Sequence, residues 1–145
     1  SGVFGGAKPD ERDINQLIFD LAEHGNRPRD MHELYRRLPS LELYAKVVEA
    51  SFPFENGTRH VVGQGETLVT QSATIPSGHS MAQFFVDKSD PRLAPKYVGM
   101  TAREACDMVL RMHNLDGLVL CNRAESWFAM LKAEIEKVVK QGEPK

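Results

Sequence analysis

Apolar residues in the first forty positions recur at helical spacing. Asp10 precedes an amphipathic stretch whose apolar positions lie three and four residues apart, namely Ile14, Leu17, Ile18, Leu21 and Ala22. This spacing predicts a first helix with Asp10 as its cap. Asp30 and Glu33 have the spacing of a capping box, which predicts a second, short helix through Arg37 that Pro39 ends.

From Leu41 the pattern changes to alternation. One side of this segment would carry the apolar residues Leu41, Leu43, Ala45 and Val47, and they alternate with Glu42, Tyr44, Lys46 and Val48. This alternation predicts a strand with one buried face. An Asn56-Gly57 turn is expected to lead into a second strand that contains His60, Val61 and Val62. Residues 67–75 and 81–86 flank Pro76-Ser77-Gly78-His79, and this arrangement predicts a hairpin.

The segment from Thr101 to Val139 is typical of a helix, a short buried strand and a closing helix. Thr101 and Glu104 form a capping box at the start of the first of these helices. Leu118 to Cys121 is a short apolar run that fits a central strand. The closing helix is predicted from an apolar stripe made of Trp127, Phe128, Leu131, Ile135, Val138 and Val139.

These elements predict the α+β class, with helices covering a mixed, mostly antiparallel sheet. The expected order is α-α-β-β-β-β-α-β-α. The length of 145 residues suits one hydrophobic core, and we expect a single domain over residues 10–141. Residues 1–9 are expected to be a disordered tail, in which Ser1-Gly2 resembles the scar left by tag removal.

Composition narrows the class of partner. The net charge is −2 and the basic residues are dispersed among acidic ones, so nucleic acid is not an expected ligand. No apolar run reaches the ~18–20 residues that cross a bilayer, and the start shows no secretion signal, so we expect no membrane partner. Two cysteines, Cys106 and Cys121, are too few for a disulfide scaffold and favour a cytoplasmic location.

The second half of the chain resembles a known family. The residues that carry the resemblance fall in the order strand, loop, helix, Asp-Gly turn, strand and closing helix: Met81–Phe85, Tyr97–Glu104, Leu115–Leu120, Glu125–Trp127 and Glu134–Ile135. This pattern is similar to the amino-terminal domain of the enhanced serine sensitivity proteins, called SseB-type domains. That family often continues from the central strand into Asn-Pro-Gly, whereas this chain has Cys121-Asn122-Arg123-Ala124, so we expect a different local turn.

The resemblance implies a bacterial accessory or secretion-associated protein with an α+β fold. The resemblance implies no catalytic residues, no cofactor and no metal site. We therefore expect a non-enzymatic, protein-binding domain that binds a protein partner or itself through a sheet edge or an apolar patch. A toxin-neutralising or secretion-associated role is a further hypothesis that rests on the resemblance alone.

The alternative hypothesis is enzymatic and uses Cys121. This cysteine is predicted at the carboxyl end of a central strand, where open sheets often place active sites, and His113 or His79 is the candidate base. A small thiol-dependent hydrolase or transferase of this kind predicts rapid alkylation of Cys121 near neutral pH. Packing of the cysteine as a small buried hydrophobe is the competing explanation.

Other candidate sites are weaker. The five histidines show no i, i+4 pair, so we expect no metal site, and Gly63-Gln64-Gly65 lacks the rest of a phosphate loop. An arginine cluster, made of Arg27, Arg29, Arg36 and Arg37, is expected to be a solvated helix face. Trp127 is expected in the core, with a role at an interface as the other possibility. The binding candidates are therefore Cys121, Asn122 and Trp127, with no cofactor expected.

Overall fold

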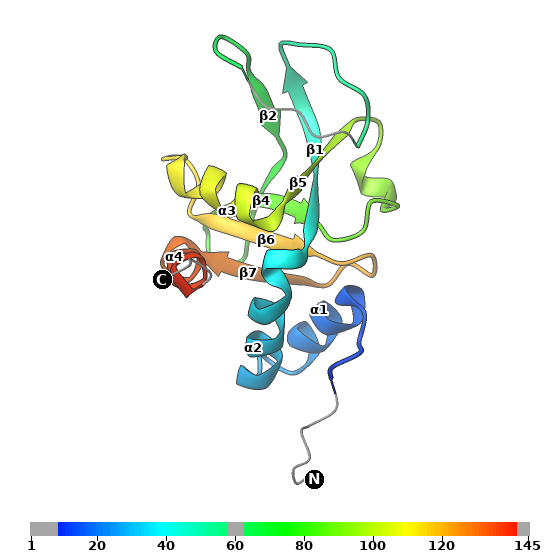
Figure 1. Cartoon of the computed structure of the whole chain (residues 1–145), viewed down its shortest axis with the longest axis vertical. Helices are drawn as coiled ribbons and strands as arrows, with labels where there is room; N and C mark the ends of the chain where they lie inside the picture. The colour runs from blue at the N-terminus through cyan, green and yellow to red at the C-terminus, as the bar shows by residue number, and fades with distance from the viewer. Residues whose placement is uncertain (1–8, 58–62, 142–145) are drawn as a thin grey trace, which may run out of the picture.

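The computed structural model describes residues 9–57 and 63–141. Its helices are α1 (Ile14–Glu23), α2 (Pro28–Arg37), α3 (Ala102–Arg111) and α4 (Lys132–Gln141), with short 3-10 helices η1 (Leu38–Ser40) and η2 (Pro91–Leu93). Its strands are β1 (Glu42–Ala50), β2 (Leu68–Thr70), β3 (Ser72–Thr74), β4 (Ser80–Phe85), β5 (Tyr97–Thr101), β6 (Gly117–Cys121) and β7 (Trp127–Leu131). The predicted α+β class is confirmed, and the predicted order of elements broadly matches (Figure 1).

One mixed sheet contains all the described strands. Its main order is β2-β1-β4-β6-β7, with β3 beside β4 and β5 beside β1. Among the described strands, only β4 and β6 run parallel, in a register that pairs Met81 with Gly117 and Phe85 with Cys121. The other described pairs are antiparallel, so the predicted mixed, mostly antiparallel sheet is confirmed.

The two faces of the sheet are covered differently. Side chains from all four α-helices pack on one face against Phe84, Leu120 and Phe128. The opposite face holds a second cluster to which no described α-helix contributes, formed by Tyr44, Ile75, Met81, Phe85, Leu93, Tyr97, Val119, Cys121, Ala129 and Leu131. We call this cluster and its side of the sheet the helix-free face.

Two helix starts differ from the prediction. The cap of α1 is Asp13, whose carboxylate accepts from the backbone N–H of Gln16, and not Asp10. α2 begins at Pro28, which has the fixed backbone angle that suits a first helical position, so Arg27 precedes the helix and Asp30 lies inside its first turn. The capping box predicted at Asp30 is therefore wrong. The capping box at Thr101 is confirmed.

The strands β5 and β7 were not predicted, and the single strand predicted over residues 67–75 is divided into β2 and β3. Trp127 to Leu131 form β7, not the start of the closing helix, because they pair residue by residue with β6; the helix begins only at Lys132. β5 pairs with β1 and ends at the residue that caps α3. The expected tail up to residue 8 and the expected strand at His60 to Val62 lie outside the described residues.

An ion-pair network joins α1 to α2. Asp30 is fully buried, and its carboxylate oxygens lie 3.0 Å from the guanidinium groups of Arg12 and Arg27. Arg12 also pairs with Asp10 and with Asp20. Asp10, Asp20 and Asp30 therefore hold the segment before α1 against α2 through these ion pairs, and neither Asp10 nor Asp30 caps a helix.

The predicted solvated arginine face is only partly correct. Arg36 is largely exposed and pairs with Glu33. Arg37 is mostly covered, because its guanidinium donates to the backbone carbonyls of Asp10 and Arg12 and pairs with Glu33. Arg37 is thus part of the α1–α2 network.

Acid is expected to weaken the fold through this network. Hydrogen bonds from Arg36 lower the pKa of Glu33 from 4.5 to about 2, and the pKa of Asp20 is lowered by its bond from Arg12. At Asp30 burial raises the pKa, but the bonds from Arg27 and Arg12 outweigh it, so that its pKa is also lowered. A lowered pKa in the folded state stabilises the protein above the unfolded pKa, and this contribution is lost as pH falls through the folded pKa.

The contribution of Glu33 to stability should therefore be constant above pH 4.5 and be lost as the pH falls toward 2. The urea midpoint of unfolding should fall over the same pH range. The measurement is urea unfolding followed by circular dichroism across this range. In the Glu33→Gln variant the fall should be shallower. An equally steep fall in both proteins would contradict a contribution from Glu33.

Candidate binding site at the β6–β7 turn

The structure brings the three predicted binding candidates together at one turn. Cys121 is the last residue of β6, Asn122 follows it, and Trp127 begins β7. The antiparallel register places Cys121 directly opposite Trp127. The turn between them contains Glu125, whose φ of 71° is unusual for a residue other than glycine.

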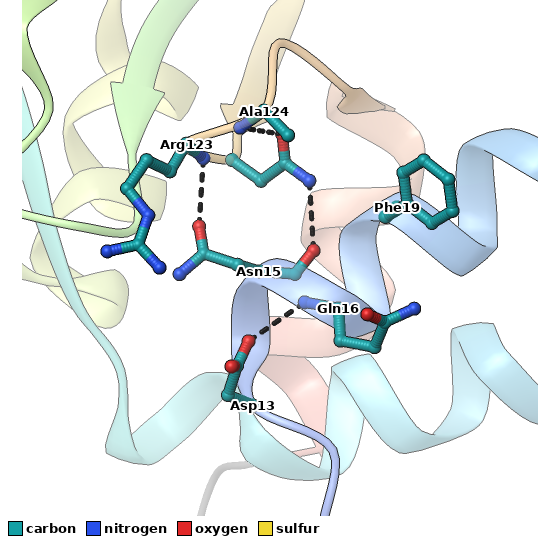
Figure 2. Close-up of a pocket in the computed structure, with 7 residues that line it drawn as sticks. Asp13, Asn15, Gln16, Phe19, Arg123 and Ala124 are labelled. Atoms are coloured by element: carbon teal, nitrogen blue, oxygen red, sulfur yellow. Dashed lines mark hydrogen bonds between the residues drawn. The ribbon is translucent and has the colours of Figure 1, made fainter.

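Asn122 joins this turn to α1. Its side chain is buried, its Nδ2 donates to the backbone carbonyl of Asn15 at 2.9 Å, and its Oδ1 accepts from the N–H groups of Ala124 at 3.0 Å and Ser126 at 2.8 Å. In return, the side-chain oxygen of Asn15 accepts from the N–H of Arg123 at 2.8 Å (Figure 2). Asn122 is therefore a positioning residue, since both polar atoms of its side chain are engaged within the protein.

A second anchor holds the same turn from the η2 side. The guanidinium of Arg92 donates to the backbone carbonyl of Asn122 and to the carboxylate of Asp90. Asp90 is almost fully buried, and its hydrogen bonds from Arg92 lower its pKa. Arg92 also lies over the ring of Phe85, 4.8 Å from the ring centre. The turn is thus held from both sides by buried or half-buried polar groups.

A depression of about 410 Å³ lies between the turn and α1. Its lining residues are Asp13, Asn15, Gln16, Phe19, Asn122, Arg123 and Ala124. Figure 2 shows Phe19 on α1 at one side of the depression and the chain of Arg123 on the other. The Arg123 guanidinium lies 3.3 Å from the carboxylate of Asp87 and is largely exposed. The depression therefore combines an exposed aromatic ring with an accessible cation.

Cys121 has the environment of a packed cysteine. It is 5% exposed on the helix-free face, and its sulfur lies 3.8 Å from the Nε2 of Gln83. Burial raises the pKa of the Cys121 thiol, although the hydrogen bond from Gln83 acts in the opposite direction. A raised pKa leaves little thiolate near neutral pH, and thiolate is the nucleophilic form.

The two candidate bases do not lie near Cys121. His79 precedes β4 and His113 precedes β6, and these parallel strands pair with their amino ends together. Cys121 lies at the other end of β6, so about 13 Å of strand separates it from the end where both histidines lie. His79 instead contacts Ser77, with 2.6 Å between its Nδ1 and the Ser77 hydroxyl oxygen. The structure does not assemble the predicted cysteine–histidine pair.

Trp127 is exposed, and the prediction of a core position is wrong. In β7 alternate side chains face opposite sides, so Phe128 and Met130 enter the core while Trp127 remains 41% exposed on the other side.

The sequence prediction of this site did not include Asn15, Phe19 and Arg92. The sequence could have indicated that Phe19 is exposed, since this large aromatic residue lies off the apolar stripe of α1. Nothing in the sequence indicates a role for Asn15 or Arg92, because only the fold brings them to the turn.

Three further findings concern metal ions, membranes and similarity to known proteins. Within residues 9–57 and 63–141, no group of three or more His, Cys, Asp or Glu side chains could hold a metal ion. No helix in the same ranges has the length and apolar character needed to cross a membrane. Comparisons of the chain with protein-family models, with curated proteins and with solved structures give no match, so the SseB-type resemblance stays a prediction.

Proposed function

We propose that this protein is a non-enzymatic, protein-binding accessory domain of SseB type that works in the cytoplasm. Its binding surface is the exposed part of the β6–β7 turn, which we call the turn surface and define as Arg123 and Trp127. The observation that carries the proposal is the 41% exposure of Trp127, the only tryptophan of the chain, on a strand whose next residue is 2% exposed. The two buried, unpaired cysteines support a reducing compartment.

The composition of the turn surface supports protein recognition. Tryptophan and arginine are enriched among the residues that dominate binding energy at protein interfaces. The Trp127 ring and the Arg123 guanidinium are both accessible at the turn that the buried Asn122 holds in place. A rigid turn presents these side chains with little loss of conformational freedom on binding, which favours affinity.

The edge of β7 offers a second mode of contact. Backbone bonds from Asn122 to Ser126 and from Lys132 to Asp116 bracket the β6–β7 ladder. Because hydrogen-bonded pairs alternate in an antiparallel ladder, the N–H and C=O groups of Trp127 and Ala129 point away from β6. β7 has no other strand partner in the described ranges, so an extended segment of a partner can add to this edge beside the Trp127 ring.

The thiol-dependent alternative has no observation in its favour. A reactive cysteine needs a partly exposed, electropositive setting and a base within hydrogen-bond reach. Cys121 is buried with a raised pKa, and both histidines lie beyond the opposite end of its strand.

The test is capture of binding proteins from the native host with Trp127→Ala beside the unchanged protein. We expect Trp127→Ala to weaken retention of the captured partner by at least about tenfold, as loss of a dominant tryptophan does. Val69→Ala is the matched control, because Val69 is 40% exposed on β2, far along the sheet from β7, and should change nothing. Tryptophan emission should shift to shorter wavelength when the purified partner covers Trp127.

Two outcomes would count against the proposal. The first is equal retention by Trp127→Ala and the unchanged protein. The second is turnover of a small metabolite by the purified chain, which would favour an enzyme. Sedimentation analysis separates a foreign partner from a second copy, since self-association makes the mass depend on concentration of this chain alone.

A further inference from the structure

Three hydrogen bonds close the Asn56-Gly57 turn against the chain around β5. The Nδ2 of Asn56 donates to the carbonyl of Pro95 at 2.7 Å, and its Oδ1 accepts from the N–H of Tyr97 at 3.4 Å. The N–H of Gly57 donates to the carbonyl of Tyr97 at 3.0 Å. Both polar ends of the Asn56 side chain and the next backbone nitrogen are therefore engaged at once.

This dipeptide carries a chemistry of its own. Asparagine is thermolabile, and a following glycine lacks the Cβ that would hinder approach to the asparagine side chain. The backbone nitrogen of Gly57 loses its proton to water and attacks Cγ of Asn56. The new N–Cγ bond closes a five-membered imide while the Cγ–Nδ2 bond breaks, and the departing nitrogen takes a proton back from water and leaves as ammonia. Water then opens the imide to aspartate or isoaspartate, so the balance is one water consumed and one ammonia released.

We propose that Asn56 is a deamidation site that the folded turn keeps closed, and that the reaction permanently releases this turn from β5. The reaction needs the nitrogen of Gly57 free of its proton, yet that proton is donated to Tyr97. It also needs Cγ of Asn56 to swing toward this nitrogen, yet the amide is held by Pro95. The attack therefore proceeds through the opened turn, and its rate follows the fraction of time that the turn is open.

The product cannot restore the closed turn. A carboxylate has no N–H to donate to the carbonyl of Pro95, and two oxygens that face each other at this distance repel. Isoaspartate also adds an atom to the backbone, which changes the path into Gly57. Opening is reversible before the reaction and irreversible after it.

Release of the turn uncovers part of the helix-free face. A Cβ on Gly57 would lie 3.0 Å from the hydroxyl of Tyr97, so the turn packs directly on that side chain. Tyr97 in turn meets Tyr44 edge to face, with 6.2 Å between the ring centres. Deamidation therefore exposes this tyrosine pair. This release of the Asn56-Gly57 turn does not depend on binding at the turn surface.

The experiment follows deamidation of the purified protein by peptide mass mapping at mildly alkaline pH, folded and in urea. We expect Asn56 to react at least about tenfold more slowly in the folded protein, since the reaction requires local opening. Asn26, which is exposed and followed by Arg27, is the internal control and should react slowly in both states. Equal rates at Asn56 in the two states would overturn the proposal.

The Asn56→Asp variant tests the release. Amide exchange at Gly57 and Tyr97 should be faster in this variant than in the unchanged protein, while Asn56→Gln, which keeps an amide but cyclises slowly, serves as a comparison. Unchanged exchange at both amides in Asn56→Asp would overturn the claim that the product opens the turn.

Discussion

Replacement of Gly117 by alanine is expected to remove most of the stability of this fold. Gly117 begins β6 and is buried between β4 and β7. A Cβ there would lie 2.0 Å from the carbonyl oxygen of Met130 and 2.9 Å from Cα of Leu131. Both are backbone atoms of the paired strand, so no side-chain rotation relieves the clash. The free energy of unfolding should fall by more than about 3 kcal/mol, at the upper end of overpacking costs.

The measurement is urea unfolding followed by circular dichroism, with soluble yield as the second readout. Gly78→Ala is the matched control. Gly78 has a φ of +91°, but a Cβ added to it would meet no atom within 4 Å, so only the backbone preference is lost, at about 1 kcal/mol. If the free energy of unfolding of Gly117→Ala is no lower than that of Gly78→Ala, β7 can move away from β6 at little cost in stability, and the prediction is wrong.

Asn122→Ala should have the second largest effect. The change leaves the carbonyl of Asn15 and the N–H groups of Ala124 and Ser126 without their buried partner. An unsatisfied buried polar group costs about 1–3 kcal/mol, so the total loss of unfolding free energy should be about 3 kcal/mol. The emission of Trp127 should also change, because the turn that positions it loses its internal bonds.

Two further variants sharpen this result. Asn122→Asp keeps an oxygen for Ala124 and Ser126 but turns a carboxylate oxygen toward the carbonyl of Asn15, so it should be clearly less stable than the unchanged protein. Asn114→Ala is the control, since Asn114 is exposed and should change stability by less than about 0.5 kcal/mol. A loss below about 1 kcal/mol in Asn122→Ala would mean that water replaces the side chain.

Local signals identified the elements whose residues bond to near neighbours. The capping box at Thr101 and Glu104 lies within four residues, and both of its bonds are present. The hairpin around Gly78 depends on a short turn, and β3 and β4 pair on either side of it. Such features need no knowledge of the distant chain, which is why periodicity and turn residues were sufficient to predict them.

Three residues of the candidate site were proposed from the sequence, but their arrangement was not predicted. Cys121, Asn122 and Trp127 are close in sequence, so their proximity follows from any tight turn. The partner of Asn122 is Asn15, more than a hundred positions away, and nothing in the sequence near either residue indicates that bond. The placement of His79 and His113 away from Cys121 also depends on the parallel register of β4 and β6.

The sequence by itself determined the α+β class, the start of α3, the hairpin before β4 and the buried run of β6. Only the tertiary structure decided that Trp127 begins a strand and lies exposed. The apolar residues from Trp127 to Leu131 fit a helix stripe and a strand equally well, because a five-residue window does not separate the two periods. Pairing with β6 makes this segment a strand, because the pairing satisfies backbone hydrogen-bonding groups of β6. In a strand, alternate side chains then face opposite sides of the sheet.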